Sequence, residues 1–432
     1  MSNDKVSIRH PEYDALENKR VVIADLRGGT DAMRAKGKAY LPKFPAELDD
    51  NYNVRLQTAT LFNIYAKTEE TMFGLVFKEE PVTDGVSLGA YTQTILENFD
   101  NKGTPFTEFA REVLRSAFDG AAAILVDAPN VVEGVTSQED VNRLGIRPYA
   151  VLYPQSCVTN WRYEVNPISK SQEMTLAVLH EMTNEADGAF GWTTVERYRV
   201  FRKEVGAPVV FWQVWREVTG SSANDREKNF IVESEGVYPN LKEIPLVVLG
   251  ELTNAPPMMD LARANVKHYQ KESNFDQLEV LAAVPMPWAR GRKNADTAPI
   301  IAADSFLDLG DDGECGWMQI DSEGFASLRD SLKMLTDQMA MMGLSMLADK
   351  TAQVDVTATE ALLDNIGDTA ELRVMAQDLK DALEKTLNVM AAYLNVSAKQ
   401  TIELRAAWAV ADERVADVSG AMANANGEDG IA

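Results

Sequence analysis

Apolar residues recur with helical spacing in the first third of the chain. One run extends from Tyr52 to Phe77 and a second from Thr107 to Phe118, after a proline-containing segment at Tyr40–Pro45. Side chains three or four residues apart share one face of an α-helix. The spacing therefore predicts amphipathic helices over both runs.

The pattern changes to that of strands after Gly120. The sequence AAAILVDAP is a continuous apolar run that ends at Asp127 and Pro129, which predicts a buried strand. Between Arg147 and Leu249, short stretches of aromatic and β-branched residues are separated by turn-like segments such as NPIS and EVGAP. This spacing predicts a meander of antiparallel strands, so the fold class is α+β.

A helix is predicted to begin at the proline pair Pro256-Pro257 and to end before Pro285 and Pro287. A short segment with two tryptophans, a basic RGRK and an acidic GDDGE follows it, and this segment is too small to fold alone.

A second helix is predicted from Phe325, because apolar residues alternate at spacings of three and four, as in a heptad repeat. They are Phe325, Leu328, Leu332, Leu335, Met339, Met342 and Met346. We favour an antiparallel hairpin with the helix at Leu261–Leu281 over a free coiled coil. The capping-box sequence from Thr357 to Glu360 then predicts the start of a long helix that reaches Asn395.

Composition narrows the possible functions. The 432 residues include 42 Lys and Arg against 66 Asp and Glu, a formal net charge of −24, which argues against tight non-specific DNA binding. Two distant cysteines form no metal or disulfide motif, and no signal peptide or bilayer-length apolar run is present, so we expect a soluble intracellular product. Only three histidines are available for imidazole chemistry.

Catalytic motifs are poorly supported. Gly85, Ser87 and Gly89 match the GxSxG pattern of hydrolases, but no buried strand precedes them, so we predict a turn into a helix near Ser87. The chain has no phosphate-binding loop and no HExxH sequence. We expect no catalytic residues, no cofactor and no metal. The acidic cluster lacks EF-hand spacing and is interpreted as a solvated turn; it comprises Asp308, Asp311, Asp312 and Glu314.

Three basic residues, Arg263, Lys267 and Lys271, share one stripe of the helix after Pro257 because they are spaced by four. A solvated helix face is the favoured interpretation. The alternative is a set of weak, sliding contacts to a polyanion.

Several segments, taken in order, resemble the portal proteins of tailed bacteriophages, in particular a group classed as a phage domain of unknown function. The matching stretches are KAYLPKFP, LFNIYAKTEETMFGLVFKEEP, GAAAILVDAP, RPYAVLYPQSCVTNWRYE, IPLVVLGELTNAPPMMDLARANVKHYQKESN and DVTATEALLDN.

The resemblance implies a portal fold with an α/β wing, a two-helix stem, a small α/β clip, a long wing helix, and a crown that is reduced or absent. The implied parts are the wing at 1–255, stem helices at 256–281 and 320–347, the clip at 282–319, a tunnel loop at 348–357, the wing helix at 358–395, and a short C-terminal segment at 396–432.

The resemblance also implies function. A portal is a homo-oligomer, expected here to be a twelve-subunit ring, at one capsid vertex of the virion, and it assembles in the host cytoplasm. Double-stranded DNA is packaged and ejected through it. Its implied partners are the terminase large subunit, the major capsid and scaffolding proteins, and a head–tail adaptor or tail proteins; no membrane is involved. A portal is not an enzyme.

Candidate sites follow from that resemblance. Residues expected along the DNA channel are Arg263, Lys267, Lys271, Lys350, Thr351 and Gln353. Clip residues expected at an interface with the motor or adaptor are Trp288, Arg290, Arg292, Lys293 and Trp317, although the two tryptophans could equally pack the clip's own strands. The apolar residues from Phe325 to Met342 would pack the stem.

The rival hypothesis is a cytosolic α+β enzyme that uses buried carboxylates such as Asp127. It predicts a monomer or dimer with one defined pocket. A purely structural coiled-coil scaffold would not explain the β-rich middle of the chain.

Overall fold

The computed structural model describes residues 5–129, 145–218, 229–239, 241–283, 286–292, 309–318, 322–345 and 371–407. Its contacts divide the chain into two compact units. Unit 1 comprises Met1–Ala24, Ala66–Met259 and Gly343–Ala432, and unit 2 comprises Asp25–Tyr65 and Asp260–Met342. The mixed helices and strands confirm the α+β class. Residues 25–65 thus group with the second unit rather than with the rest of the predicted wing.

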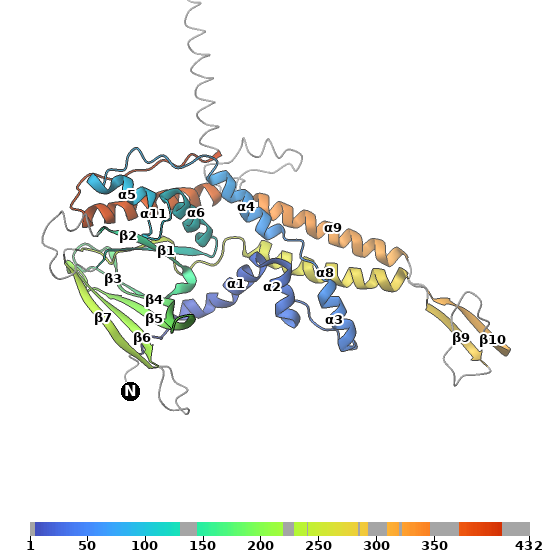
Figure 1. Cartoon of the computed structure of the whole chain (residues 1–432). Helices are drawn as coiled ribbons and strands as arrows, with labels where there is room; N and C mark the ends of the chain where they lie inside the picture. Colours follow the sequence, from blue (N-terminus) through green and yellow to red (C-terminus); the bar gives the residue numbers. More distant parts are fainter. Residues whose placement is uncertain are drawn as a thin grey trace, which may run out of the picture. The chain divides into compact units, whose positions relative to one another are not determined.

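Unit 1 contains two antiparallel sheets (Figure 1). The first has the order β2-β1-β8, with all seven residues of β1 buried, and the second is a meander in the order β3-β4-β5-β6-β7. The strands are β1 (Ala121–Asp127), β2 (Tyr149–Pro154), β3 (Val158–Val165), β4 (Gln172–Asp187), β5 (Gly191–Arg202), β6 (Val209–Val218), β7 (Asn229–Pro239) and β8 (Leu246–Gly250).

The predicted meander is therefore confirmed for five strands and wrong for two. The first and last strands of the region, β2 and β8, pair with β1 instead. Because β1 is apolar up to Asp127, it needs a paired strand at each edge as well as cover on both faces. The strands β2 and β8 are these two neighbours. A core cluster between the sheets includes Leu125, Trp161, Leu179, Phe201 and Val210.

Helices complete unit 1. Those that fall wholly within it are α5 (Thr92–Glu97), α6 (Phe106–Ala117) and α11 (Glu371–Tyr393), while α1 (Pro11–Arg27) and α4 (Ile64–Val76) cross a unit boundary. Figure 1 shows α6 and α11 beside the three-stranded sheet, and both contact β1. The predicted long helix is confirmed over Glu371–Tyr393, whereas residues 358–370 lie outside the described residues.

Unit 2 contains α2 (Gly29–Lys36), α3 (Asp49–Thr58), α8 (Met259–Ala283), the β9 (Met286–Arg292) and β10 (Leu309–Met318) hairpin, and α9 (Ser322–Ser345), whose end passes into unit 1. No helix among the described residues is both long and apolar enough to cross a bilayer.

The predicted single run from Tyr52 to Phe77 is wrong, because it is divided into α3 and α4. Tertiary hydrogen bonds replace helical ones in the segment between them. Arg34 donates to the carbonyl of Ala59, the hydroxyl of Thr30 accepts from the amide of Leu61, and the side chain of Asn63 donates to the carbonyl of Leu26.

Candidate functional site

The helices α8 and α9 form an antiparallel pair in unit 2, as the apolar spacing predicted. His268 Nε2 lies 3.2 Å from Thr336 Oγ1, Lys271 Nζ donates to Ser331 Oγ at 2.7 Å, and the rings of Phe275 and Phe325 meet edge to face. Residue numbers rise along α8 as they fall along α9, which fixes the antiparallel direction. The β9–β10 hairpin connects the far ends of the two helices in sequence.

Heptad residues of α9 differ in exposure. Leu335 and Met339 are buried, and Phe325 and Leu332 are half-buried. Leu328 and Met342 are exposed even though they belong to the predicted packing stripe. Residue 346 lies outside the described residues.

A second apolar stripe on α9 was not part of the heptad prediction. Met334 and Met341, seven residues apart, are 58% and 52% exposed. At 100° per residue they lie on a different side of the helix from the buried Leu335 and Met339. We call Met334 and Met341 the exposed α9 residues; Leu328 and Met342 are also exposed but lie on the same side of the helix as Leu335.

The basic stripe of α8 has two environments. Arg263 and Lys267 are exposed, and Arg263 makes a weak surface pair with Asp260 at 3.7 Å. Lys271 is half-buried and bonded to Ser331 of α9. Arg263 and Lys267 are therefore available to a polyanion, whereas Lys271 contributes to helix packing. The predicted loop residues Lys350, Thr351 and Gln353 lie outside the described residues.

The segment between α8 and α9 contains a two-stranded sheet. Trp288 pairs with Gly316 across β9 and β10, and a Cβ at Gly316 would lie 2.9 Å from Trp288 Nε1, so glycine is needed for the indole to lie there. Trp288 and Arg290 are exposed. Arg292 and Trp317 occupy backbone positions in β9 and β10, and Lys293 lies outside the described residues.

The acidic cluster does not form the predicted turn. Asp311, Asp312 and Glu314 belong to β10, which has a register shift between Leu309 and Glu314, and Asp308 lies outside the described residues. The shift accommodates extra residues in one strand, which hydropathy does not signal. Within the described residues, no group of His, Cys, Asp and Glu side chains is arranged to hold a metal ion.

Asp127, the carboxylate of the rival enzyme hypothesis, lies in a buried hydrogen-bond network. Its Oδ2 accepts from Arg199 at 2.5 Å and from Tyr149 at 3.3 Å, and its Oδ1 accepts from Tyr238 at 2.5 Å. Arg199 also donates to Glu181. Burial, followed by the charge of Asp127, raises the pKa of Tyr149 to about 12.

This network joins the two sheets, because its members come from β1, β2, β4, β5 and β7. Both oxygens of Asp127 are engaged, so the carboxylate is held as a structural bridge. Sequence placed Asp127 correctly at the end of its strand but could not identify its partners, which are far away in the chain.

The GxSxG match has no nucleophile-elbow geometry. No strand ends before Ser87, whose amide donates to Gln400 Oε1 at 2.6 Å. A 3-10 turn begins at Gly89 and α5 at Thr92, slightly later than the predicted start near Ser87.

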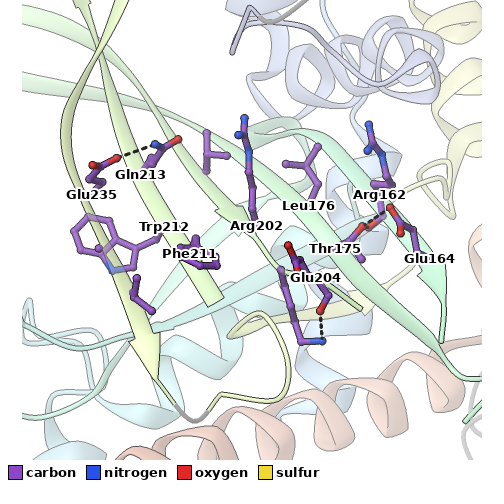
Figure 2. Close-up of a pocket in the computed structure, with 14 residues that line it drawn as sticks. Arg162, Glu164, Thr175, Leu176, Arg202, Glu204, Phe211, Trp212, Gln213 and Glu235 are labelled. Carbon is purple, nitrogen blue, oxygen red and sulfur yellow. Dashed lines mark hydrogen bonds between the residues drawn. The ribbon is translucent and has the colours of Figure 1, made fainter. Parts of the chain in front are cut away.

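A cavity of about 1050 Å³ lies on the five-stranded sheet, as Figure 2 shows. Its floor and walls include Leu176, Phe211 and Trp212, and its charged residues include Arg162 and Arg202. Trp212 lies over Gly236 of the next strand, where a Cβ would come within 2.6 Å of the indole. The cavity could not be predicted from the sequence, because its residues come from five strands and local patterns do not show how those strands pair.

Residues 257–394, from the start of α8 through α11, match the model of a domain of unknown function, DUF4055. No curated protein matches the chain.

Proposed function

We propose that the chain is a portal subunit of a tailed bacteriophage. It would assemble into a ring at one capsid vertex, through which double-stranded DNA is packaged and ejected. Support comes from the order helix, hairpin, antiparallel helix in unit 2, and from the DUF4055 match over the same region. In this proposal α8 and α9 are the stem, β9–β10 belong to the clip, and α11 is the wing helix.

The observation that carries the proposal is the set of exposed α9 residues. Among the described residues, α8 contacts α9 through Ser331 and Thr336, whereas Met334 and Met341 are exposed. Exposed apolar residues that follow one helix face mark a protein interface. Neighbouring copies of the same hairpin in a ring would cover this face.

The net charge of the chain is compatible with a channel through which DNA passes. A chain of formal net charge −24 carries an excess of negative charge, which disfavours tight binding of DNA and favours its passage. Arg263 and Lys267 would give weak phosphate contacts within that acidic surface.

The exposed Trp288 and Arg290 of β9 suit contact with a packaging motor or adaptor, because Trp and Arg are enriched at interface hot spots. We assign this surface to the terminase large subunit during packaging and to a head–tail adaptor or tail protein afterwards. Capsid and scaffolding proteins would surround the ring in the virion.

Mass measurement of the purified full-length chain by light scattering and native mass spectrometry tests the proposal. Twelve copies of the 47.7 kDa chain weigh about 572 kDa, and electron micrographs should show a ring with a central hole. The paired change Met334→Glu and Met341→Glu should abolish this particle while leaving helix content unchanged, because both residues are already exposed.

Ala340→Glu is a control for position, since it adds one carboxylate to an exposed residue on another face of α9. It should leave the ring intact. A chain that stays a compact dimer even with capsid and scaffolding proteins would overturn the proposal.

A further inference from the structure

The hairpin formed by β4 and β5 extends beyond the rest of its sheet. Their pairing runs without a break from Leu176↔Arg202 to Asp187↔Gly191, whereas the pairing of β5 with β6 ends at Arg197↔Arg216. Among the described residues, residues 191–196 of β5 therefore pair with β4 alone. We call residues 183–195 the aromatic arm.

Specific residues define the turn and the base of the hairpin that forms the arm. Gly188 has φ of +70°, and a Cβ at Gly191 would lie 2.4 Å from the carbonyl oxygen of Asp187, so the turn requires both glycines. Thr194 Oγ1 donates to Asn184 Oδ1 at 2.9 Å, and Arg197 donates to Thr183 and Glu185 at the base of the arm.

Two large aromatic side chains near its tip are unburied. Phe190 is 97% exposed and Trp192 is 73% exposed. An unpaired two-stranded ribbon that carries such residues has little to gain from them in isolation, because apolar side chains stabilise a protein only when they leave water. Phe190 and Trp192 would therefore contribute to stability only if the arm inserted into another surface.

The same sheet has an open groove at the opposite end of its strands. One row of residues in register crosses all five strands: Arg162, Leu176, Arg202, Phe211 and Val237. Phe211 and Val237 are exposed, and the buried Val200 lies in the floor of the cavity of about 1050 Å³. The N-terminal segment covers a neighbouring part of this face, where Val6 packs against Val178 and Tyr198.

The two arginines of the groove are free to bind. Neither the Arg162 nor the Arg202 guanidinium has a hydrogen-bonding or ion-pair partner among the described residues. Figure 2 shows both side chains extending to the same side of the sheet, with Leu176 between them. The carboxylates at the rim are partly engaged, since Glu164 accepts from Thr175 and Glu235 accepts from Gln213.

Charge and shape make the arm and the groove complementary. The arm contains two carboxylates and no basic residue. Glu185 is paired with Arg197 and Arg216, whereas Asp187 has no ion pair among the described residues. An arginine stacks well on a tryptophan face and pairs with a carboxylate. Asp187, Phe190 and Trp192 of the arm thus match the free arginines and the apolar floor of the groove.

The arm cannot fill the groove of its own chain. Leu176 and Asp187 are eleven residues apart along the same strand, β4, which corresponds to about 36 Å. The aromatic arm and the groove therefore lie at opposite ends of the same sheet.

We propose that the aromatic arm of one copy inserts into the sheet groove of a second copy of this chain. Because the two surfaces differ, the contact is head-to-tail, and such contacts produce rings or filaments rather than closed two-fold dimers. The inference rests on the proposed function only in requiring that the chain self-associates. It adds to the ring a contact in unit 1 that is separate from α9.

A photo-crosslinking experiment on the full-length chain tests the contact directly. Benzoylphenylalanine replaces Ala189 at the tip, so Phe190 and Trp192 are retained. Isotope-labelled and unlabelled copies are mixed, and mass spectrometry identifies the linked peptides. We expect crosslinks between copies, from the arm to peptides of β5 and β6 that contain Arg202 or Phe211.

Reciprocal variants test the direction of the contact. The arm variant is Phe190→Ser with Trp192→Ser, and the groove variant is Arg202→Glu with Phe211→Ser. Each alone should weaken self-association about tenfold or more, because buried aromatic and arginine residues dominate interface affinity. A mixture of the two should recover a one-to-one pair, since one intact arm then meets one intact groove. Val54→Ser, at an exposed apolar residue of α3, is the control and should behave as wild type.

The outcomes separate this inference from the proposed function. An assembled ring whose crosslinks lie outside the groove, or whose assembly ignores both variants, overturns the arm contact and leaves the portal proposal standing. Crosslinks into the groove within open chains or filaments support the arm contact and count against the portal ring. A chain that remains monomeric at all concentrations overturns the inference.

Discussion

The carboxylate of Asp127 connects residues that are far apart in sequence. It receives hydrogen bonds from Tyr149 in β2, Arg199 in β5 and Tyr238 in β7, so one side chain bridges the two sheets of unit 1. A buried ion pair adds little net stability over an apolar pair, but losing one partner is costly because the other charge remains buried.

Replacing Asp127 with Asn tests this role. The amide keeps the shape but loses the charge that faces Arg199, so we expect the free energy of unfolding to fall by about 3–5 kcal/mol. Urea denaturation followed by tryptophan fluorescence would measure it. Glu108→Gln, which removes an exposed pair with Arg111, should cost less than about 1 kcal/mol. Similar losses in both variants would contradict the bridging role.

Glu173 gives a pH-dependent contribution of defined sign. Hydrogen bonds from Asn166, Lys203 and the amide of Gly206 lower its pKa from an ordinary 4.5 to about 2. Because the folded-state pKa lies below the unfolded value, the stabilisation is present above about pH 4.5 and is lost as the pH falls towards 2.

We therefore expect Glu173→Gln to be less stable than wild type at pH 6, with a difference that shrinks as the pH falls from 4.5 to 2. Thermal unfolding across that range would measure it. Glu204→Gln, at an exposed neighbouring carboxylate, is the control for losing one charge. A difference that does not change with pH would show that Glu173 acts without its charge.

Between elements, a buried amide joins α8 to the start of α4. The side chain of Asn265 is fully buried; its Oδ1 accepts from the amide of Tyr65 at 2.9 Å, and its Nδ2 donates to the carbonyl of Phe62. Asn265 thus accepts a hydrogen bond from an amide in the first turn of α4, as a capping residue would, although it belongs to a distant helix.

Asn265→Ala should destabilise unit 2 by about 1–3 kcal/mol, because it removes two hydrogen bonds made by a fully buried side chain and leaves a space where the amide was. Hydrogen exchange should accelerate at the amide of Tyr65. Lys267→Ala, at an exposed position on the same helix, should change neither quantity appreciably. Unchanged protection at Tyr65 in Asn265→Ala would show that the amide contributes no local stability.

Local patterns predicted the elements whose neighbours are also local. The strand after Gly120, the helix over Thr107–Phe118, the α8 and α9 pair and the antiparallel meander all follow from periodicity. Periodicity failed where distant residues decide the backbone, as in the break between α3 and α4. It also failed where strands leave a meander for another sheet, as β2 and β8 do.

The candidate surfaces likewise divide into features that local sequence patterns predict and features that depend on distant residues. The stripe of Arg263, Lys267 and Lys271 was visible in the sequence, but only the structure separates the exposed pair from the packed Lys271. The groove beneath Arg162 and Arg202 depends on register across five strands, which no local pattern contains.

Considered as a whole, the chain combines strong acidity with a few placed cations. Screening reduces contacts between exposed charges separated by more than about 8–10 Å in physiological salt, so acidic surface far from a phosphate repels it weakly while a nearby lysine still binds it. An assembled ring would then hold DNA through few phosphates and release it readily. This behaviour gives the proposed channel a quantitative test.

The paired change Arg263→Gln and Lys267→Gln should weaken binding of short duplex DNA to the assembled particle and flatten its salt dependence. Each lost phosphate contact lowers the slope of log K against log salt by about 0.9. Fluorescence anisotropy between 50 and 200 mM salt would measure the slope. Lys67→Gln with Lys102→Gln removes two exposed lysines of unit 1 and matches the change in net charge. If both pairs change the slope equally, net charge alone governs DNA affinity and the α8 stripe has no special part; a larger change for Arg263 and Lys267 places the phosphates against α8.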